Sequence, residues 1–324
     1  RWLKNKGVTA IITAERGDGT LTRFGIEEYV ADCVILLDHR VTEQVSTRRL
    51  RIVKYRGTLH GTSEYPFLIG KNGISVLPIT SLTLEHRVSN KRISTGIKEL
   101  DNMLDGKGFY RGSSVLLSGT AGTGKSTLSA AFVDAACSRG ERCLYFAFEE
   151  STSQIQRNMR SIGVDLATHV KKGLLQFHVA RPSHYGLEMH LVTMYDLIKE
   201  YNPDVVVLDP ITDFFAIGSG AEVKATITRI IDFLKTRQIT GFFISYTSEE
   251  EGADPSTVGI SSLIDAWIIL RNLEINGERQ RGLFIIKSRG MPHSNQVRSY
   301  QLTDDGIRIG ALDTAGRRNE LNAS

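Results

Sequence analysis

The segment 119–126 constrains the fold of this chain more than any other. It reads Gly-Thr-Ala-Gly-Thr-Gly-Lys-Ser and satisfies the full G-x-x-x-x-G-K-S pattern of a phosphate-binding loop. A strand pattern precedes the loop and a helical run, 127–139, follows it, which is the context that this motif requires. Motif and context together argue against a turn that is glycine-rich by chance. The sequence therefore predicts an α/β fold.

Short apolar runs alternate with helical patterns on both sides of the loop, as in a mainly parallel sheet with crossover helices. The expected buried strands are 113–118, 143–148, 205–209 and 241–246. Two crossover helices are expected from apolar residues at helical spacing, within 187–201 and 223–234. The segments 266–271 and 283–287, with a turn at Asn276-Gly277, predict an antiparallel hairpin added to that sheet.

Each part of the loop has a chemical reason. Glycines let backbone N–H groups turn inward around phosphate oxygens, and the following helix directs its positive end at them. Lys125 would place a charge on the β and γ oxygens, and the Ser126 hydroxyl would bind Mg²⁺, which prefers oxygen ligands. The expected ATP-binding residues here are Gly119, Thr120, Ala121, Gly122, Thr123, Gly124, Lys125, Ser126 and Thr127.

Carboxylates follow two of the expected strands. Asp209 ends the run 205–208 at the carboxyl edge of the sheet, where an aspartate can hold a magnesium shell. Glu149 and Glu150 end another run, so one of them can face the γ-phosphate and accept a proton from the nucleophile. The alternatives are a solvated strand-ending carboxylate for Asp209 and, for the glutamates, acidic residues that stabilise a helix N-terminus.

Two distant segments of the chain share a spaced pattern. Lys54-Tyr55-Arg56-Gly57 with His60 matches Lys287-Ser288-Arg289-Gly290 with His293, each pair lying 233 positions apart (287 − 54 and 293 − 60). The matches at 32–36 with 265–269 and at 72–76 with 305–309 keep this offset, so we interpret the series as an internal repeat.

The repeat predicts the domain organisation. Residues 1–86 are expected to be the C-terminal part of a first ATPase domain whose front half is absent, 87–312 a complete second domain, and 313–324 a flexible tail. We therefore expect a longer natural protein with two tandem domains.

Taken together, these motifs resemble the KaiC family, the ATPases and autokinases of the cyanobacterial circadian oscillator, within the RecA and DnaB superfamily. The resemblance covers nearly the whole chain. The matching features are 119–126, Phe148-Glu149-Glu150-Ser151, Asp209, Ile260-Ser261-Ser262 before Asp265, and both Lys-x-Arg-Gly stretches with their histidines. Ile162 departs from the pattern, because the family commonly offers a tryptophan to the adenine there.

The resemblance implies a RecA-like fold and a nucleotide-dependent homohexameric ring with ATP between subunits. It makes Glu149 the general base, with a share in magnesium binding. It also implies regulatory partners of the KaiA and KaiB type. Basic residues would reach the next subunit's nucleotide; those expected to take part in ATP binding are Arg281, Lys287, Ser288, Arg289 and His293, and, for the missing first site, Lys54, Arg56, Thr58 and His60. The alternative for these residues is a solvated hairpin end.

The family phosphorylates an adjacent serine and threonine in its second domain, and Ser261-Ser262 stand at that place. Either hydroxyl can attack phosphorus. The repeat offset puts Glu28 and Tyr29 at the corresponding place in the first copy, so only the second copy is expected to be the substrate. The alternative for Ser261 and Ser262 is a loop or a helix cap.

Composition weighs on the rival functions. The apolar fraction of 41% and charged fraction of 23% fit an ordinary globular protein, and a net charge of +4 is too small to be a nucleic-acid footprint. A nucleic-acid translocase with this fold would need basic pore loops, whereas 216–221 carry no Lys or Arg and Glu249–Glu251 are acidic. A scaffold that binds ATP without turnover would not need Glu149 and Asp209. With three scattered cysteines, no signal peptide and no membrane span, we expect a cytoplasmic protein.

Overall fold

The computed structural model describes residues 2–15, 27–42, 45–70, 73–76, 88–247, 260–275 and 277–312. Three of the expected features, the acidic stretch 249–251, Asn276 and the tail 313–324, lie outside these residues. The chain divides into two compact units, Arg1–Thr80 and Ser81–Ser324, which are described separately.

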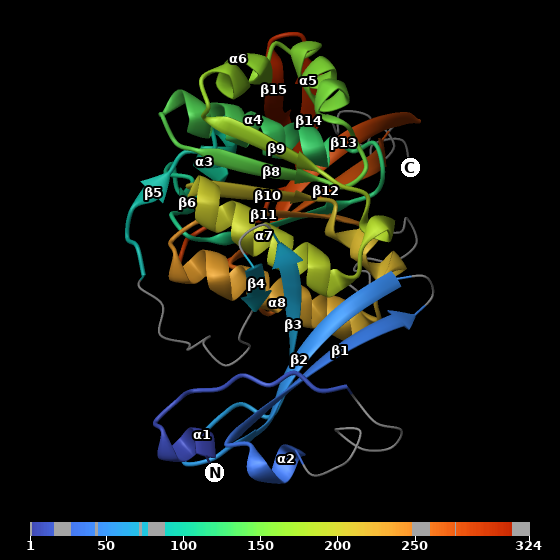
Figure 1. The fold of residues 1–324 in the computed structure, drawn as a ribbon. Helices are drawn as coiled ribbons and strands as arrows, with labels where there is room; N and C mark the ends of the chain where they lie inside the picture. Colours follow the sequence, from blue (N-terminus) through green and yellow to red (C-terminus); the bar gives the residue numbers. More distant parts are fainter. Residues whose placement is uncertain are drawn as a thin grey trace, which may run out of the picture. The chain divides into compact units, whose positions relative to one another are not determined.

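The second unit is built on a nine-stranded sheet (Figure 1) in the order β15-β14-β13-β12-β7-β11-β10-β8-β9. Six neighbouring strands run parallel: β12 (Ala266–Ile275), β7 (Ser114–Gly119), β11 (Thr240–Tyr246), β10 (Val205–Asp209), β8 (Cys143–Ala147) and β9 (Leu175–Val179). Three antiparallel strands follow β12: β13 (Glu278–Ser288), β14 (Arg298–Thr303) and β15 (Gly306–Ala311). The expected α/β sheet with an added hairpin is confirmed.

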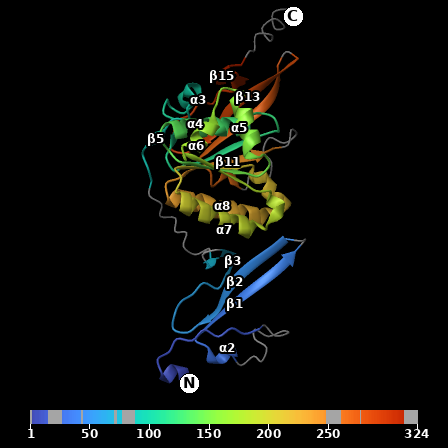
Figure 2. The same cartoon turned by 45° about the horizontal axis from the view of Figure 1, so that its top comes forward.

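Helices cover both faces of this sheet (Figures 1 and 2). One face carries α3 (Lys98–Met103), α4 (Lys125–Ser138), α5 (Thr152–Arg160) and α6 (Leu166–Lys171); the other carries α7 (Leu187–Tyr201) and α8 (Gly220–Thr236). Short 3₁₀ turns lie at Pro182–His184 (η2) and Ile211–Ala216 (η3), and β5 (Arg92–Ile93) pairs with β6 (Phe109–Tyr110). Since both faces are covered, the central strands are buried along their length and read as continuous apolar runs.

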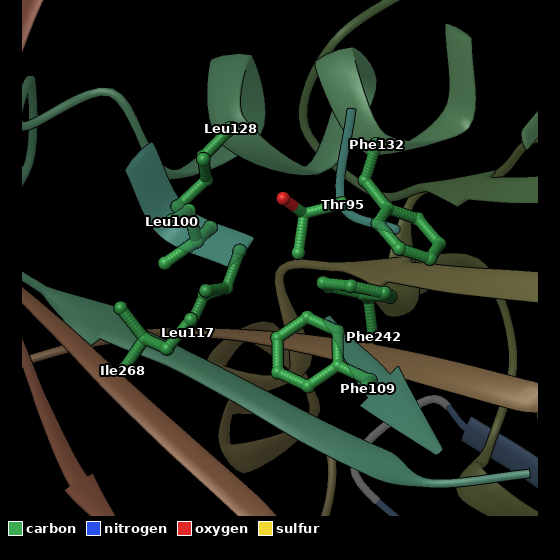
Figure 3. A pocket seen from close by; sticks show the side chains of 8 residues that line it. All are labelled: Thr95, Leu100, Phe109, Leu117, Leu128, Phe132, Phe242 and Ile268. Carbon is green, nitrogen blue, oxygen red and sulfur yellow. The ribbon is translucent and has the colours of Figure 1, made fainter. Parts of the chain in front are cut away.

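The core beneath α4 fixes the helix that follows the phosphate loop. Figure 3 shows Phe109, Phe132 and Phe242 meeting between α4 and the sheet, with centroids 4.4 Å apart for the last two. Leu117 and Leu128 close the same cluster. The cavity left among these side chains is about 10 Å³, the space of one water molecule at most. This site is close-packed core, and it holds α4 firmly against β7 and β11.

The first unit has four antiparallel strands: β1 (Cys33–Thr42), β2 (Val45–Tyr55), β3 (Glu64–Gly70) and β4 (Gly73–Val76). Short helices lie at Trp2–Asn5 (α1) and Glu27–Val30 (α2). The ends of β1 and β2 coincide with those of β12 and β13 at the offset found in the sequence. Both hairpins have a register shift at the same place, Val34/Ile35 in one and Trp267/Ile268 in the other. The sequence repeat is therefore also a repeat of structure.

Candidate ATP-binding and phosphoryl-transfer site

The phosphate loop joins β7 to α4 and depends on glycine at two close approaches. A Cβ on Gly119 would lie 2.1 Å from the carbonyl oxygen of Leu270, and one on Gly124 would lie 2.8 Å from a ring carbon of Tyr300. Gly124 also has φ of 95°, which favours glycine. Thr123 donates its hydroxyl to the Thr120 carbonyl at 2.9 Å. The loop is thus closed by its own contacts, with the N-terminus of α4 directed into it.

Lys125 lies buried inside this loop. Its Nζ donates to the carbonyl oxygens of Gly119 at 2.8 Å and Thr120 at 2.7 Å, and lies 4.2 Å from the ring centroid of Tyr246. Burial lowers the pKa of Lys125 to about 8, against the opposing effect of Asp209 and Glu149. The ammonium group is therefore held where the β and γ oxygens of a bound nucleotide are expected.

Asp209 ends β10 in a buried position, 7% exposed. It accepts a hydrogen bond from the Tyr145 hydroxyl at 2.5 Å. The pKa of Asp209 is raised to about 6, mainly by burial. The hydrogen bonds from Tyr145 and Ser126 act to lower this pKa, and the charges of Glu150 and Glu149 act to raise it. Asp209 and Ser126, the two expected magnesium-binding groups in the loop and on the strand, are thus in contact.

Glu149 and Glu150 follow β8, held beside β10 by a bond from the Phe148 N–H to the Asp209 carbonyl at 2.8 Å. Glu149 is exposed and Glu150 half-buried. The Tyr246 hydroxyl donates to Oε2 of Glu149 at 2.6 Å. Burial and this carboxylate raise the pKa of Tyr246, so the phenol stays a donor at neutral pH. Ser151 then starts α5 with a capping box completed by Gln154.

Four residues of this site were not expected from the sequence. Tyr145 and Tyr246 contact Asp209 and Glu149, as described above. Tyr300, on β14, donates to the Gly124 carbonyl at 3.0 Å. Asp213, in η3, has a pKa raised to about 6 by burial and by the charges of Glu149 and Asp209. One signal was available for Tyr246: it ends a strand at the carboxyl edge of the sheet, where ligands of α/β folds bind.

The basic residues of the hairpin lie beside the expected phosphoacceptors. Lys287 Nζ donates to the Ser261 carbonyl at 2.7 Å, and the Arg289 guanidinium donates to the Ser262 carbonyl. Ser261 is half-buried in a helical segment, and Ser262 is exposed in the turn that follows it. Burial, together with Arg289, lowers the pKa of Lys287. In this chain the two cations thus hold the backbone at Ser261 and Ser262.

The first unit repeats this arrangement. Lys54 Nζ donates to the Glu28 carbonyl at 2.7 Å, and Arg56 donates to the Tyr29 carbonyl at 2.9 Å. Because both donors and both acceptors are displaced by the offset of the repeat, the contact is a property of the repeated unit and not of one segment.

The other expected site residues lie apart from this contact. Arg281 lines a groove of about 430 Å³ over β12, β13 and β14, together with Asn272 and Tyr300. Asn272 is 3.5 Å from the Thr120 hydroxyl, so this groove borders the chain's own phosphate loop. The remaining positions were assigned only by resemblance: Ser288 is buried, His293 and His60 are half-buried, and Thr58 is exposed. Ile162, which departs from the family pattern, is packed in the core.

The residues present fit a magnesium–nucleotide complex. A loop of this type can offer backbone N–H groups to phosphate oxygens, and this one carries the Lys125 ammonium group and the Ser126 hydroxyl. Within the described ranges no group of three or more His, Cys, Asp or Glu side chains could hold a metal ion by itself. Mg²⁺ typically keeps several waters and is bound through one or two carboxylates plus phosphate oxygens. Ser126, Asp209 and Glu149 are the residues that would hold it.

Two further expectations concern the whole chain. Cys33, Cys137 and Cys143 are free thiols. None of the helices in the part of the chain that the structure describes has the length and apolar character needed to cross a membrane.

Comparison with known proteins identifies the relatives of this chain. The family described as "ATPase: KaiC" matches residues 1–81 and 93–314. The circadian clock protein KaiC2 of Synechocystis sp. strain PCC 6803 is 54% identical over 310 residues, and KaiC3 of the same organism 38% over 312. The circadian clock oscillator protein KaiC of Thermostichus vulcanus is 38% identical over 310 residues. Each match covers 95% of this chain but only 55%, 62% and 60% of the respective relative.

Proposed function

Because this chain belongs to the KaiC family of ATPases, we propose that it hydrolyses ATP at the loop 119–126 and transfers phosphate from ATP to its own Ser261 or Ser262. The observation that carries the proposal is the meeting of Lys125, Asp209 and Glu149 around one loop: Tyr246 contacts both Lys125 and Glu149, and the N–H that precedes Glu149 in the chain donates to the Asp209 carbonyl. A fold alone would not support a reaction. The chemical groups at this loop do.

The residues divide the work of phosphoryl transfer. Lys125 and the loop N–H groups stabilise charge on the phosphate oxygens. Mg²⁺, held through Ser126 and Asp209 with a share from Glu149, would neutralise developing charge on the β and γ oxygens. The oxygen of the nucleophile bonds to the γ phosphorus, and Glu149 accepts the proton which that oxygen loses. At the same time the bond between the γ phosphorus and the β,γ-bridging oxygen breaks, and ADP leaves. With water as the nucleophile the result is hydrolysis; with a serine hydroxyl it is a phosphoserine.

The assembly is part of the proposal. We expect a nucleotide-dependent homohexamer in which Lys287 and Arg289 of one subunit reach the nucleotide of the next, with Arg281, Ser288 and His293 nearby. In the first unit, Lys54, Arg56, Thr58 and His60 would play the corresponding role for the nucleotide site of the first domain, whose front half is absent from this sequence. Relatives of this chain are named circadian clock proteins, and we propose the same class of role here, with regulatory partners of the KaiA and KaiB type and without nucleic acid.

Phosphate release from Mg–ATP by the purified chain tests the hydrolytic half. Lys125→Ala and Glu149→Gln should each nearly abolish turnover, the first through phosphate binding and the second through loss of the base. Arg308→Gln is a matched control, because Arg308 forms an exposed ion pair with Asp305 on β15, a pair worth little in free energy. Turnover at the parental rate in either site variant would contradict the proposal. Added DNA or RNA should leave the rate unchanged; stimulation would favour a translocase.

A further inference from the structure

A single side chain, that of Tyr246, contacts two of the groups that the proposed reaction uses, Glu149 and Lys125. The Tyr246 hydroxyl donates to Oε2 of Glu149 at 2.6 Å, and its ring lies 4.2 Å from Nζ of Lys125. Neither contact is between sequence neighbours. Tyr246 is half-buried, and both contacts are made without a bound nucleotide.

The backbone of Tyr246 is fixed to the phosphate loop. Tyr246 ends β11, whose register pairs it with Gly119, the last residue of β7. The next N–H, that of Thr247, donates to the Gly119 carbonyl at 3.1 Å. The strand before it is buried. The tyrosine ring therefore projects from a rigid support that is part of the loop's own framework.

Glu149 has a less constrained position. It lies beyond the end of β8, which β10 separates from β11, and its side chain is exposed. A free glutamate side chain has several rotamers, and ordering one costs conformational entropy. The hydrogen bond from Tyr246 crosses above β10 and ties the carboxylate to the framework of the phosphate loop. One carboxylate oxygen accepts this bond, which leaves Oε1 to accept a proton.

We infer that Tyr246 is a positioning residue of the phosphoryl-transfer site, which orients the Glu149 carboxylate relative to Lys125. This inference rests on the proposed function. In the reaction the phenol keeps its own proton and donates the hydrogen bond throughout; the proton of the nucleophile goes to Oε1 of Glu149. Tyr246 exchanges no atom with the substrate, and its effect on rate passes through Glu149.

Tyr246→Phe tests the inference, since it removes the hydroxyl and keeps the ring beside Lys125. We expect kcat for phosphate release to fall about tenfold, the loss expected for a hydrogen bond to a charged group. We expect KM, the affinity for a fluorescent ATP analogue and the melting temperature to stay at parental values. A merely structural role would lower the melting temperature or the affinity along with kcat.

A double-mutant cycle shows whether the hydroxyl acts through Glu149. Single-turnover hydrolysis of γ-labelled ATP is measured for the parent, Tyr246→Phe, Glu149→Gln and the double variant. The hydroxyl should matter little once Glu149 is replaced, so the double variant should match Glu149→Gln. An equal loss in both backgrounds would overturn the inference, and so would a Tyr246→Phe rate at or above the parental one. Parental turnover by Glu149→Gln would instead contradict the proposed function.

Discussion

The hydroxyl of Tyr300 donates a hydrogen bond to the carbonyl oxygen of Gly124, at 3.0 Å, and its ring closes the space where a side chain at position 124 would lie. Tyr300 is fully buried on β14, in the antiparallel part of the sheet. The added strands therefore do more than extend the sheet, because they support the last turn of the phosphate loop from behind.

Tyr300→Phe should weaken ATP binding with a small loss of stability. The hydroxyl bond is worth about 1 kcal/mol, and the Gly124 carbonyl keeps its bond from the Leu128 N–H. We expect the free energy of unfolding to fall by about that amount, and ATP affinity to fall severalfold because the loop loses its support. Denaturant unfolding and nucleotide titration measure the two effects. Tyr185→Phe is the matched control, since Tyr185 is exposed; an equal effect there would contradict the role of Tyr300.

Asp209 should destabilise the folded chain at neutral pH. Its pKa is raised from 3.8 to about 6, so between these values the folded state binds the proton that the unfolded state has lost. The free energy of unfolding that depends on protonation of Asp209 is therefore fully present below pH 3.8, and it is lost as pH rises through about 6. Asp209→Asn should raise the free energy of unfolding at pH 7 by roughly 1–3 kcal/mol in metal-free buffer, while abolishing ATP hydrolysis.

The pH profile provides the internal control for this prediction. The stability difference between Asp209→Asn and the parent should shrink as pH falls from about 6 to 4, where Asp209 becomes protonated. Urea unfolding across this range measures it. A constant difference, or a variant less stable than the parent at pH 7, would show that the buried carboxylate is compensated by its neighbours.

The central strands and the phosphate loop could be predicted because each is encoded locally. The run 205–208 is apolar and the whole of 205–209 is buried, and the predicted strand 205–209 coincides with β10. The strands β9 and β14 were not predicted as strands, although LQFHV alternates apolar and polar residues and RSYQLT does so over part of its length. The partners of Tyr246 could not be predicted, because they depend on strand order in space, and periodicity does not encode strand order.

Ser261→Ala combined with Ser262→Ala should remove self-labelling from γ-labelled ATP and leave ATP hydrolysis intact. Both substitutions keep the backbone carbonyls that Lys287 and Arg289 hold, so the acceptor segment should keep its position. Ser262 is exposed and Ser261 half-buried, which favours Ser262 as the first acceptor. Mass spectrometry of the parent, incubated with Mg–ATP, locates the phosphate. Undiminished labelling of the double variant would place the acceptors elsewhere.

Arg289 should act on ATP held by Lys125 of an adjacent subunit. It follows β13, which is far in sequence from the phosphate loop, and its contact in this chain is with the Ser262 carbonyl. The first unit presents Arg56 in the same way. A cation supplied across an interface can accelerate phosphoryl transfer by roughly 10³ to 10⁵ fold. Arg289→Ala alone should therefore lose most ATP hydrolysis while still binding ATP.

Mixing the Lys125→Ala and Arg289→Ala variants separates action across an interface from action within one chain. Each variant alone has no complete site. In a mixed ring, however, some interfaces combine an intact loop from the Arg289→Ala subunit with an intact arginine from the Lys125→Ala subunit. Phosphate release should therefore recover to a fraction of the parental rate, set by the mixing ratio. Subunit exchange is confirmed with differently tagged chains. If rings that have exchanged subunits show no more activity than the Lys125→Ala and Arg289→Ala variants alone, Arg289 serves its own chain and the assignment across the interface is wrong.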